Sequence, residues 1–186
     1  MNRRHLFAGL SGAVILPWAV RLRPRAAFAQ PASPTAPTTP IGADDYKRMT
    51  LMVGTLAKQT SELAMQKAGN AKVKQFAGFE VAEQTAIAQA LTSQQTPPAA
   101  ALDEKRAAAL KNLQGASGAD FDKAYIAAQI DGHSELLGIQ DAFLQGKGQD
   151  TASLLASDTA HIATLAKAVI QMHLAMLKDL NDMLRA

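Results

Sequence analysis

Residues 119–145, ADFDKAYIAAQIDGHSELLGIQDAFLQ, carry the clearest pattern in this 186-residue chain. Large apolar side chains recur there at the spacing of an α-helix with one buried face. That face is expected to comprise Phe121, Tyr125, Ile126, Leu136, Leu137, Ile139, Phe143 and Leu144. His133 falls within the apolar stripe, whereas Asp131 and Glu135 are expected to point away from it. The stretch therefore predicts a long helix that brings one imidazole into a hydrophobic core.

Helix-forming sequence extends over the rest of residues 44–186. Alanine, leucine, lysine and glutamine dominate there, and the only prolines are Pro97 and Pro98. Such a composition favours helices over strands, and glycine and proline mark where the helices end. The expected helices are 45–68, 71–93, 102–113, 119–145 and a last one from 150 or 151 to 184.

The connections between these helices predict how they pair. Short connections join the first two long helices and the last two, which predicts two antiparallel pairs. The longer connection between them contains the short helix 102–113 and permits the crossover of ferritin-like bundles. We therefore predict an all-α fold over residues 44–186: a ferritin-like four-helix bundle with an extra short helix in the crossover.

The first 29 residues have the features of a twin-arginine signal peptide. Arg3 and Arg4 precede an apolar run over residues 6–20, and Ala27-Phe28-Ala29 offers the small residues of a cleavage site. The run is shorter than the roughly 20 residues that span a membrane, and the alternative is an uncleaved anchor. We expect export to the periplasm and no transmembrane span in the mature protein.

The segment that follows the signal, residues 30–43, contains four prolines and little to bury. It predicts a disordered Pro/Thr-rich linker. Of the chain's 19 basic side chains, five arginines lie in residues 1–29 with no acid, so 14 basic and 16 acidic side chains follow. The resulting charge of −2 lacks the basic surface that nucleic-acid binding requires. The basic residues expected on one solvated face are Lys72, Lys74, Lys105, Arg106 and Lys111.

Ionisable side chains interrupt the apolar stripes of three helices. They need partners, because taking a charge out of water is costly. A rise of about 1.5 Å per residue brings groups from three helices to a comparable mid-bundle height. The expected group is Glu80, Glu83, His133, Asp158 and His161. On the same count His173 belongs to a different layer, roughly 18 Å from His161.

Two interpretations of this group remain open. It resembles a depleted carboxylate-bridged di-iron site, able to hold a divalent ion of iron, manganese or zinc. The other interpretation is a hydrogen-bonded cluster that sets the register of the helices, and it is favoured because Glu62 of the first helix points outward. The chain has no cysteine, which excludes zinc–thiolate, iron–sulfur and cysteine-nucleophile chemistry. No catalytic residue is identified.

Two segments resemble a known bacterial family. They are Lys72–Ala77, KVKQFA, and Gly118–Tyr125, GADFDKAY, followed by His133 and by His173-Leu174. At this separation they resemble domain of unknown function family 4142, a bacterial envelope family with a ferritin-like helical fold. The resemblance covers about residues 45–177 and implies that fold and an envelope location.

The chain departs from the family pattern around its histidines. The family typically carries Asp-His where this chain has Glu83-Gln84, and Asp-His where it has Gly132-His133; Lys167-Ala168 replaces a Leu-Pro step. The resemblance therefore carries over His133 and His173 but not a histidine at position 84. We expect an exported binding or structural domain with a divalent metal as its candidate cofactor. The alternatives are a di-metal oxidase or peroxide-handling enzyme, and an envelope module with a protein partner.

Overall fold

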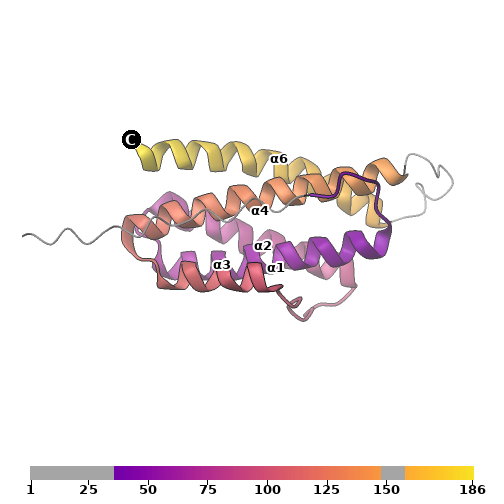
Figure 1. The fold of residues 1–186 in the computed structure, drawn as a ribbon, viewed down its shortest axis with the longest axis horizontal. Helices are drawn as coiled ribbons and strands as arrows, with labels where there is room; N and C mark the ends of the chain where they lie inside the picture. Colours follow the sequence, from indigo (N-terminus) through magenta and orange to yellow (C-terminus); the bar gives the residue numbers. More distant parts are fainter. Residues whose placement is uncertain (1–35, 148–157) are drawn as a thin grey trace, which may run out of the picture. The chain divides into compact units, whose positions relative to one another are not determined.

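Five α-helices form the regular structure of the residues that the computed structural model describes, 36–147 and 158–186 (Figure 1). They are α1 (Ala43–Lys67), α2 (Ala71–Thr92), α3 (Glu104–Gly115), α4 (Gly118–Lys147) and α6 (Asp158–Arg185). Neither range contains a strand, so the all-α prediction is confirmed. The predicted signal peptide, residues 30–35 of the linker and the expected first turns of the last helix lie outside the described residues.

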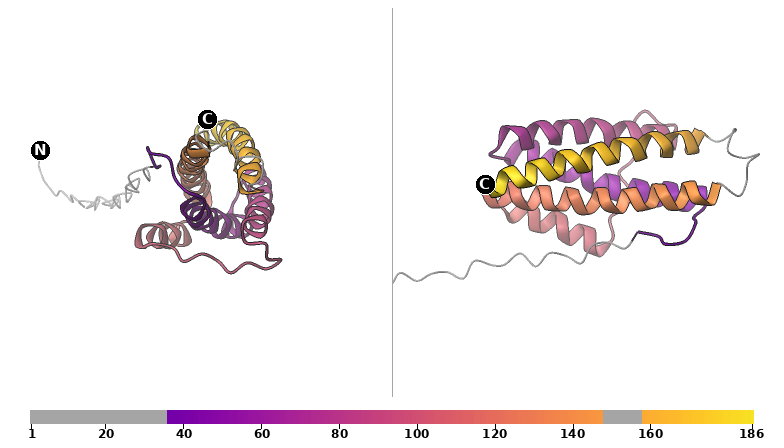
Figure 2. Two further views of the ribbon diagram at one scale, coloured as in Figure 1. Left: turned by 90° about the vertical axis from the view of Figure 1, so that its right-hand side faces the viewer. Right: turned by 90° about the horizontal axis from the view of Figure 1, so that it is seen from above.

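The four long helices lie side by side, and hydrogen bonds fix their directions. Tyr46, near the start of α1, donates to Gln140 near the end of α4, with 2.7 Å between Oη and Oε1. Further along, the hydroxyls of Ser61 and Tyr125 are also 2.7 Å apart, so α1 and α4 are antiparallel. Figure 2 shows α2 beside α1 and α6 beside α4. Helices α2 and α4 therefore run in the same direction, and the crossover that contains α3 connects them.

Two hydrophobic clusters fill the interior of the four long helices, and a polar layer lies between them. Along α4, Phe121 belongs to the first cluster, His133 to the polar layer and Phe143 to the second cluster. Each of the other long helices also passes from one hydrophobic cluster, through the polar layer, to the other cluster. The buried polar residues of this layer are Thr60, Ser61, Glu80, Gln84, Gln129, His133 and His173.

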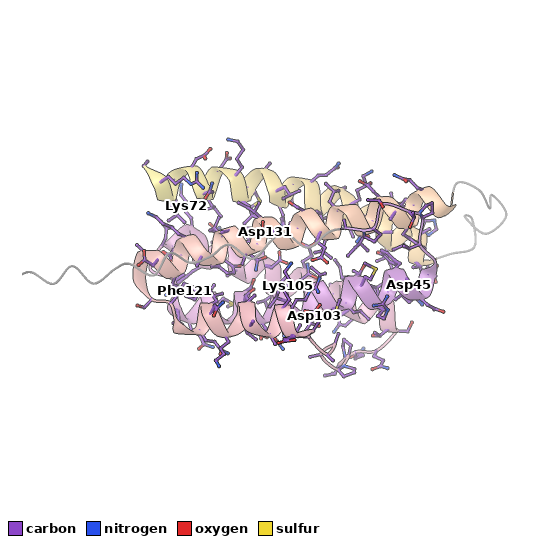
Figure 3. All side chains as sticks on the ribbon, viewed as in Figure 1. Asp45, Lys72, Asp103, Lys105, Phe121 and Asp131 are labelled. Carbon is purple, nitrogen blue, oxygen red and sulfur yellow. The ribbon has the colours of Figure 1, made fainter. Side chains whose placement is uncertain are left out.

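Helix α3 lies outside this arrangement, against α1 and α4 (Figure 2). Asp103, marked with Lys105 at the start of α3 in Figure 3, caps the helix by accepting a hydrogen bond from the backbone N–H of Arg106. The Arg106 guanidinium is buried between the carboxylates of Asp103 and Glu135. The expectation that Arg106 lies on a solvated face is wrong, because α3 packs over α4; Glu135, expected to point away from the apolar stripe, is covered by α3.

The end of the predicted linker packs against the bundle. The backbone N–H of Ile41 donates to the carbonyl of Ala142 on α4, at 3.3 Å, and the Ile41 side chain packs on the second hydrophobic cluster. Pro40 lies close to Gly146, where an added Cβ would come within 3.2 Å of the proline ring. Residues 40 and 41 therefore direct the chain into α1 from the surface of α4.

Helix α6 is the one described helix that is long and apolar enough, by length and composition alone, to cross a membrane. In this fold 33% of its most apolar stretch is buried. Its inner face supplies Ile170, Leu177 and Leu180 to the two hydrophobic clusters. A core helix of a soluble bundle meets the same criterion, so its composition is accounted for in part by packing.

Candidate metal centre

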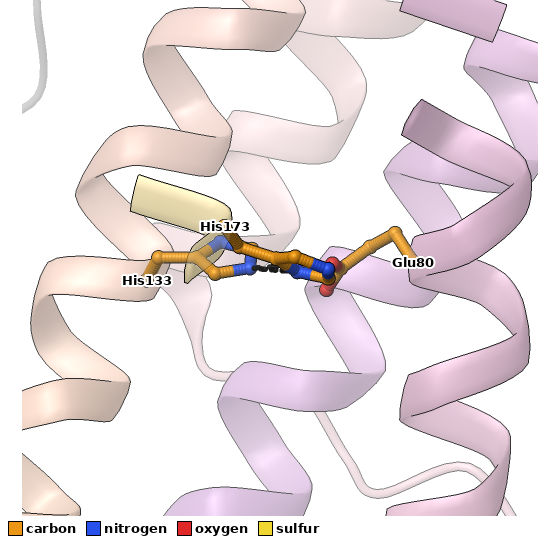
Figure 4. A group of neighbouring side chains, drawn as sticks. All are labelled: Glu80, His133 and His173. Carbon is orange, nitrogen blue, oxygen red and sulfur yellow. Dashed lines mark hydrogen bonds and ion pairs between the residues drawn. The ribbon is translucent and has the colours of Figure 1, made fainter. Parts of the chain in front are cut away.

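Three side chains from three helices meet in the polar layer. Glu80 comes from α2, His133 from α4 and His173 from α6 (Figure 4). Glu80 and His133 are fully buried, and His173 is 3% exposed. Each residue occupies a core-facing position in its helix, so the packing of the two hydrophobic clusters on either side forces the three polar groups together.

The facing atoms form a triangle with equal sides. Glu80 Oε2 lies 3.2 Å from His133 Nε2 and 3.2 Å from His173 Nδ1, and these two nitrogens are 3.2 Å apart. A tetrahedral ion with bonds of about 2.0–2.1 Å separates its ligands by about 3.3 Å. One ion placed just outside the plane of the triangle would therefore reach all three atoms at bonding distance.

The hydrogen bond made by His133 Nδ1 determines whether Nε2 of the same ring presents a lone pair to the triangle. His133 Nδ1 lies 2.8 Å from the carbonyl oxygen of Gln129, one helical turn earlier. A carbonyl only accepts, so Nδ1 carries the proton, and in the neutral ring Nε2 presents a lone pair to the triangle. The same arrangement, in which a backbone carbonyl holds the distal N–H, orients histidines that bind metals.

The carboxylate of Glu80 is buried without a hydrogen bond from any residue in the described ranges, and water does not reach either oxygen. Its 3.2 Å contacts with the imidazoles are ion-pair contacts and lack hydrogen-bond geometry. One proton on His173 Nδ1 can serve either His133 Nε2 or Glu80, but not both. A buried carboxylate in this position requires a compensating positive charge, which a protonated imidazole or a bound cation can supply.

Glu83 connects the triangle to the surface. Its Oε2 lies 3.2 Å from His173 Nδ1, and its side chain is 15% exposed, whereas that of Glu80 is fully buried. Glu83 follows Glu80 by three residues on α2, slightly less than one helical turn. Both carboxylates therefore lie on the same side of the helix. Glu83 thus contacts His173 from the solvent side, but it is outside the group of three donor atoms that lie within 4.8 Å of one another.

The electrostatics of the group follow from burial and proximity. Burial opposes ionisation of Glu80, but the two imidazoles prevail and lower its pKa to about 2. Burial and the charge on Glu80 raise the pKa of Glu83. Burial opposes the charged form of His133, but contact with Glu80 outweighs it and raises the pKa of His133. The centre thus holds one firmly ionised carboxylate that attracts protons or cations to the imidazole nitrogens.

Aromatic and hydroxyl side chains enclose the triangle. The Phe76 ring contacts the His173 ring edge to face, with centroids 5.2 Å apart. Helix α1 contributes the hydroxyls of Thr60 and Ser61, which both accept from Gln129 Nε2. The layer therefore has a charged side, formed by α2, α4 and α6, and a neutral hydrogen-bonded side at α1.

The structure brings together Glu80, Glu83 and His133 from the predicted group, but not Asp158 and His161, which are exposed on α6. The expectation that His173 occupies a different layer is wrong. His133 lies 14 residues before the end of α4, and His173 lies 15 residues after the start of α6. Antiparallel helices of equal rise therefore place these two residues at the same height. The height expected for His173 from the sequence was wrong because it rested on a last helix that starts near residue 150, whereas α6 starts at Asp158.

Gln84, which stands where the family typically has a histidine, is buried at the interface of α1 and α2. A Cβ at Gly54 of α1 would overlap its amide oxygen, so this glycine makes room for the side chain. Gln84 is not one of the three facing groups. The loss of a family histidine at this position therefore leaves the triangle intact.

A comparison with protein families identifies the family of this chain. The family model described as "Domain of unknown function (DUF4142)" matches residues 28–180. The chain belongs to this family. No curated protein and no solved structure gave a significant match. Within this DUF4142 chain, the two residues His133 and His173 that the resemblance had carried over are the two imidazoles of the triangle.

Sequence reasoning missed a second role of the GADFDKAY segment. Asp122 accepts hydrogen bonds from the backbone N–H groups of Gly69 and Asn70, at 3.0 and 2.9 Å, and so holds the α1–α2 turn against α4. Three residues later, Tyr125 bonds Ser61. Asp122 and Tyr125 therefore have structural roles, and they position α1 and α2 around the triangle.

Proposed function

We propose that this protein is an exported, ferritin-like binding domain whose polar layer holds one divalent metal ion. Glu80, His133 and His173 are the ligands that the polar layer supplies. The observation that carries the proposal is the 3.2 Å triangle around a Glu80 carboxylate that receives no hydrogen bond within residues 36–147 and 158–186. One proton on His173 Nδ1 cannot serve both Glu80 and His133 Nε2, so a cation that contacts all three atoms would stabilise the buried group.

The donor set narrows the class of ion. Two imidazoles with one or two carboxylates suit zinc, ferrous iron and manganese. The chain has no cysteine and therefore no thiolate ligand, which disfavours cuprous copper. Zinc fits best, because the equal spacing of the three atoms matches one face of a tetrahedron.

A single ion is favoured over a di-metal centre. In carboxylate-bridged di-iron bundles all four helices supply ligands. Here α1 places Thr60 and Ser61 in the layer, and the carboxylate of Glu62 pairs with Lys58 at the surface. One candidate metal-binding group was found in the described part of the chain. The proposal is therefore metal binding or metal-dependent stabilisation rather than di-metal oxidation.

The finer features of the fold and the location belong to the same proposal. A ferritin-like topology is supported by the parallel direction of α2 and α4 and by the crossover through α3. Export by the twin-arginine route is supported by Arg3-Arg4, the apolar run and Ala27-Phe28-Ala29. Replacement of both arginines by lysine, followed by fractionation of cells, tests this route: the wild-type chain is expected in the periplasm and the variant in the cytoplasm.

The metal proposal is tested by elemental analysis and titration of purified protein with zinc, ferrous iron and manganese. We expect about one equivalent of metal in the wild-type protein and a loss of at least tenfold in affinity for His133→Ala and His173→Ala. His161→Ala is the matched control, since His161 is exposed on the same helix as His173. If no added ion binds, or if His161→Ala lowers affinity as much as His173→Ala, the triangle is a hydrogen-bonded cluster and the proposal is wrong.

A further inference from the structure

The outer surface of α6 carries a regular apolar stripe. Its members, called the α6 stripe below, are Leu165, Ala168, Met172 and Ala175, and all four are exposed. Leu165 is 69% and Met172 is 54% exposed, the two highest values among the large apolar side chains noted as exposed. Isolated exposed apolar residues are common, but a continuous row on one helix indicates an interaction surface.

The spacing of the α6 stripe is that of a coiled-coil seam. Its intervals of three, four and three residues place Leu165 and Met172 at one heptad position and Ala168 and Ala175 at the other. The opposite face of the helix packs into the bundle through Ala163, Ala166, Ile170 and Leu177. Helix α6 therefore has two apolar faces, and the fold buries only one of them.

We propose that the α6 stripe is the contact surface of a homodimer, in which α6 of a second copy lies antiparallel against it. A two-fold axis would pass between Ala168 and Met172. Such an interface is isologous, so each residue contact occurs twice. The proposal does not depend on metal binding.

The order of large and small side chains in the stripe fits this antiparallel pairing. About an axis midway between Ala168 and Met172, Met172 of one copy faces Ala168 of the other. Leu165 faces Ala175 in the same way. Each large side chain therefore meets a small one, which lets knobs fill holes without overlap. A parallel pair would instead place leucine on leucine and alanine on alanine.

The charges that flank the stripe fit the same arrangement. The same two-fold axis places His161 of one copy opposite Asp179 of the other. Both residues are exposed. Asp182, which would approach Asp158 of the second copy, is already paired with Lys178 at 2.8 Å. A His161–Asp179 pair thus lies at each end of the apolar row, and Lys178 offsets the like charges of Asp182 and Asp158 beyond it.

A hollow beside the stripe offers further room. It measures about 250 Å³, lies between α2 and α6, and is lined in part by Phe79, Met176 and Asp179. Phe79 is itself 49% exposed. The hollow and Phe79 extend the apolar contact beyond a single helix.

The oligomeric state of the purified full chain tests the proposal. Sedimentation equilibrium over a range of protein concentrations is expected to show a reversible monomer–dimer equilibrium. Met172→Lys places two charges at the centre of the seam and is expected to weaken the dimer at least tenfold. Gln171→Lys is the matched control, because Gln171 is the exposed neighbour outside the stripe, and it should leave dimerisation unchanged.

The orientation is tested by cross-linking, which is simplified by the absence of cysteine from the chain. A mixture of Leu165→Cys and Ala175→Cys proteins should form a mixed disulfide dimer under mild oxidation faster than either protein alone. Faster self-linking of Leu165→Cys would indicate a parallel pair and would overturn the antiparallel arrangement. A protein that stays monomeric at every concentration, or that binds anionic lipid vesicles through the stripe without dimerising, would overturn the proposal as a whole.

Discussion

The Arg106 guanidinium of α3 and the Glu135 carboxylate of α4 form an ion pair that is buried beneath the crossover helix. Asp103 contacts the same guanidinium from the start of α3. The ion pair is therefore the main polar attachment of α3 to α4. Because it is buried, breaking it from one side leaves an uncompensated charge.

Removal of one partner should destabilise the protein strongly. Glu135→Ala is expected to lower the free energy of unfolding by about 3 kcal/mol, because the buried Arg106 charge loses a carboxylate. The double variant Arg106→Met with Glu135→Leu should recover most of this loss, since apolar residues of similar size can replace a buried pair. Urea unfolding measures both effects, and exposed Glu104→Ala is the control. Equal losses for Glu135→Ala and Glu104→Ala would contradict the role assigned to the pair.

The acid of the GADFDKAY segment should be structurally important. Asp122→Ala is expected to cost about 3 kcal/mol, because two backbone N–H groups in the α1–α2 turn lose a charged acceptor. Asp120→Ala, two residues earlier and exposed in the first turn of α4, should cost only a few tenths of a kcal/mol. The comparison is made by chemical denaturation, with hydrogen exchange at Gly69 and Asn70 as a local readout. Unchanged exchange at these two amides in Asp122→Ala would refute the assignment.

Tyr46 should make stability depend on alkaline pH. Burial raises the pKa of Tyr46 to about 12, and a hydrogen bond with Thr50 opposes this in part. Above a pH of about 10 the unfolded chain loses the phenol proton first, so wild-type stability falls as pH rises toward 12. Tyr46→Phe, which loses the bond to Gln140, should be about 1–2 kcal/mol less stable at pH 7. The gap between the two proteins should narrow between pH 10 and 12 in urea titrations; a constant gap would count against the buried phenol.

The effect of Glu80→Gln should depend on metal. Without metal, the amide removes the contacts with the two imidazoles that lower the pKa of Glu80, so the melting temperature should fall at neutral pH. With free metal at 100 times its dissociation constant, the wild-type protein should gain about 2.7 kcal/mol, and the variant should lose most of that gain. Calorimetry with and without chelator measures both quantities. A variant that gains as much stability from added metal as the wild-type protein would show that Glu80 is not a ligand.

Local sequence features were sufficient to predict the helices. The apolar period, the good helix formers and the Gly and Pro punctuation placed α1, α2, α3 and α4 within a few residues of their observed bounds. These features act over one or two turns, so they can be recognised in a single segment. For the same reason, Glu80 and His133 could be identified as polar residues on buried faces.

The composition of the site could not be predicted in full from single helices. His173 was expected in another layer and Asp158 and His161 at the centre, because their heights depended on an assumed start of the last helix. Arg106 was expected on a solvated face, because the sequence of a single helix does not show which other helix it packs against. Both errors concern relations between helices.

The sequence by itself determined an all-α chain, its family, and two of the three residues of the triangle, because helix period and motif spacing are local properties. Only the tertiary structure decided that His173 completes the triangle and that Arg106 is buried. Relative height and coverage depend on how whole helices pack. Here the two hydrophobic clusters set the register of α2, α4 and α6, and the ionisable groups between the clusters meet as a result.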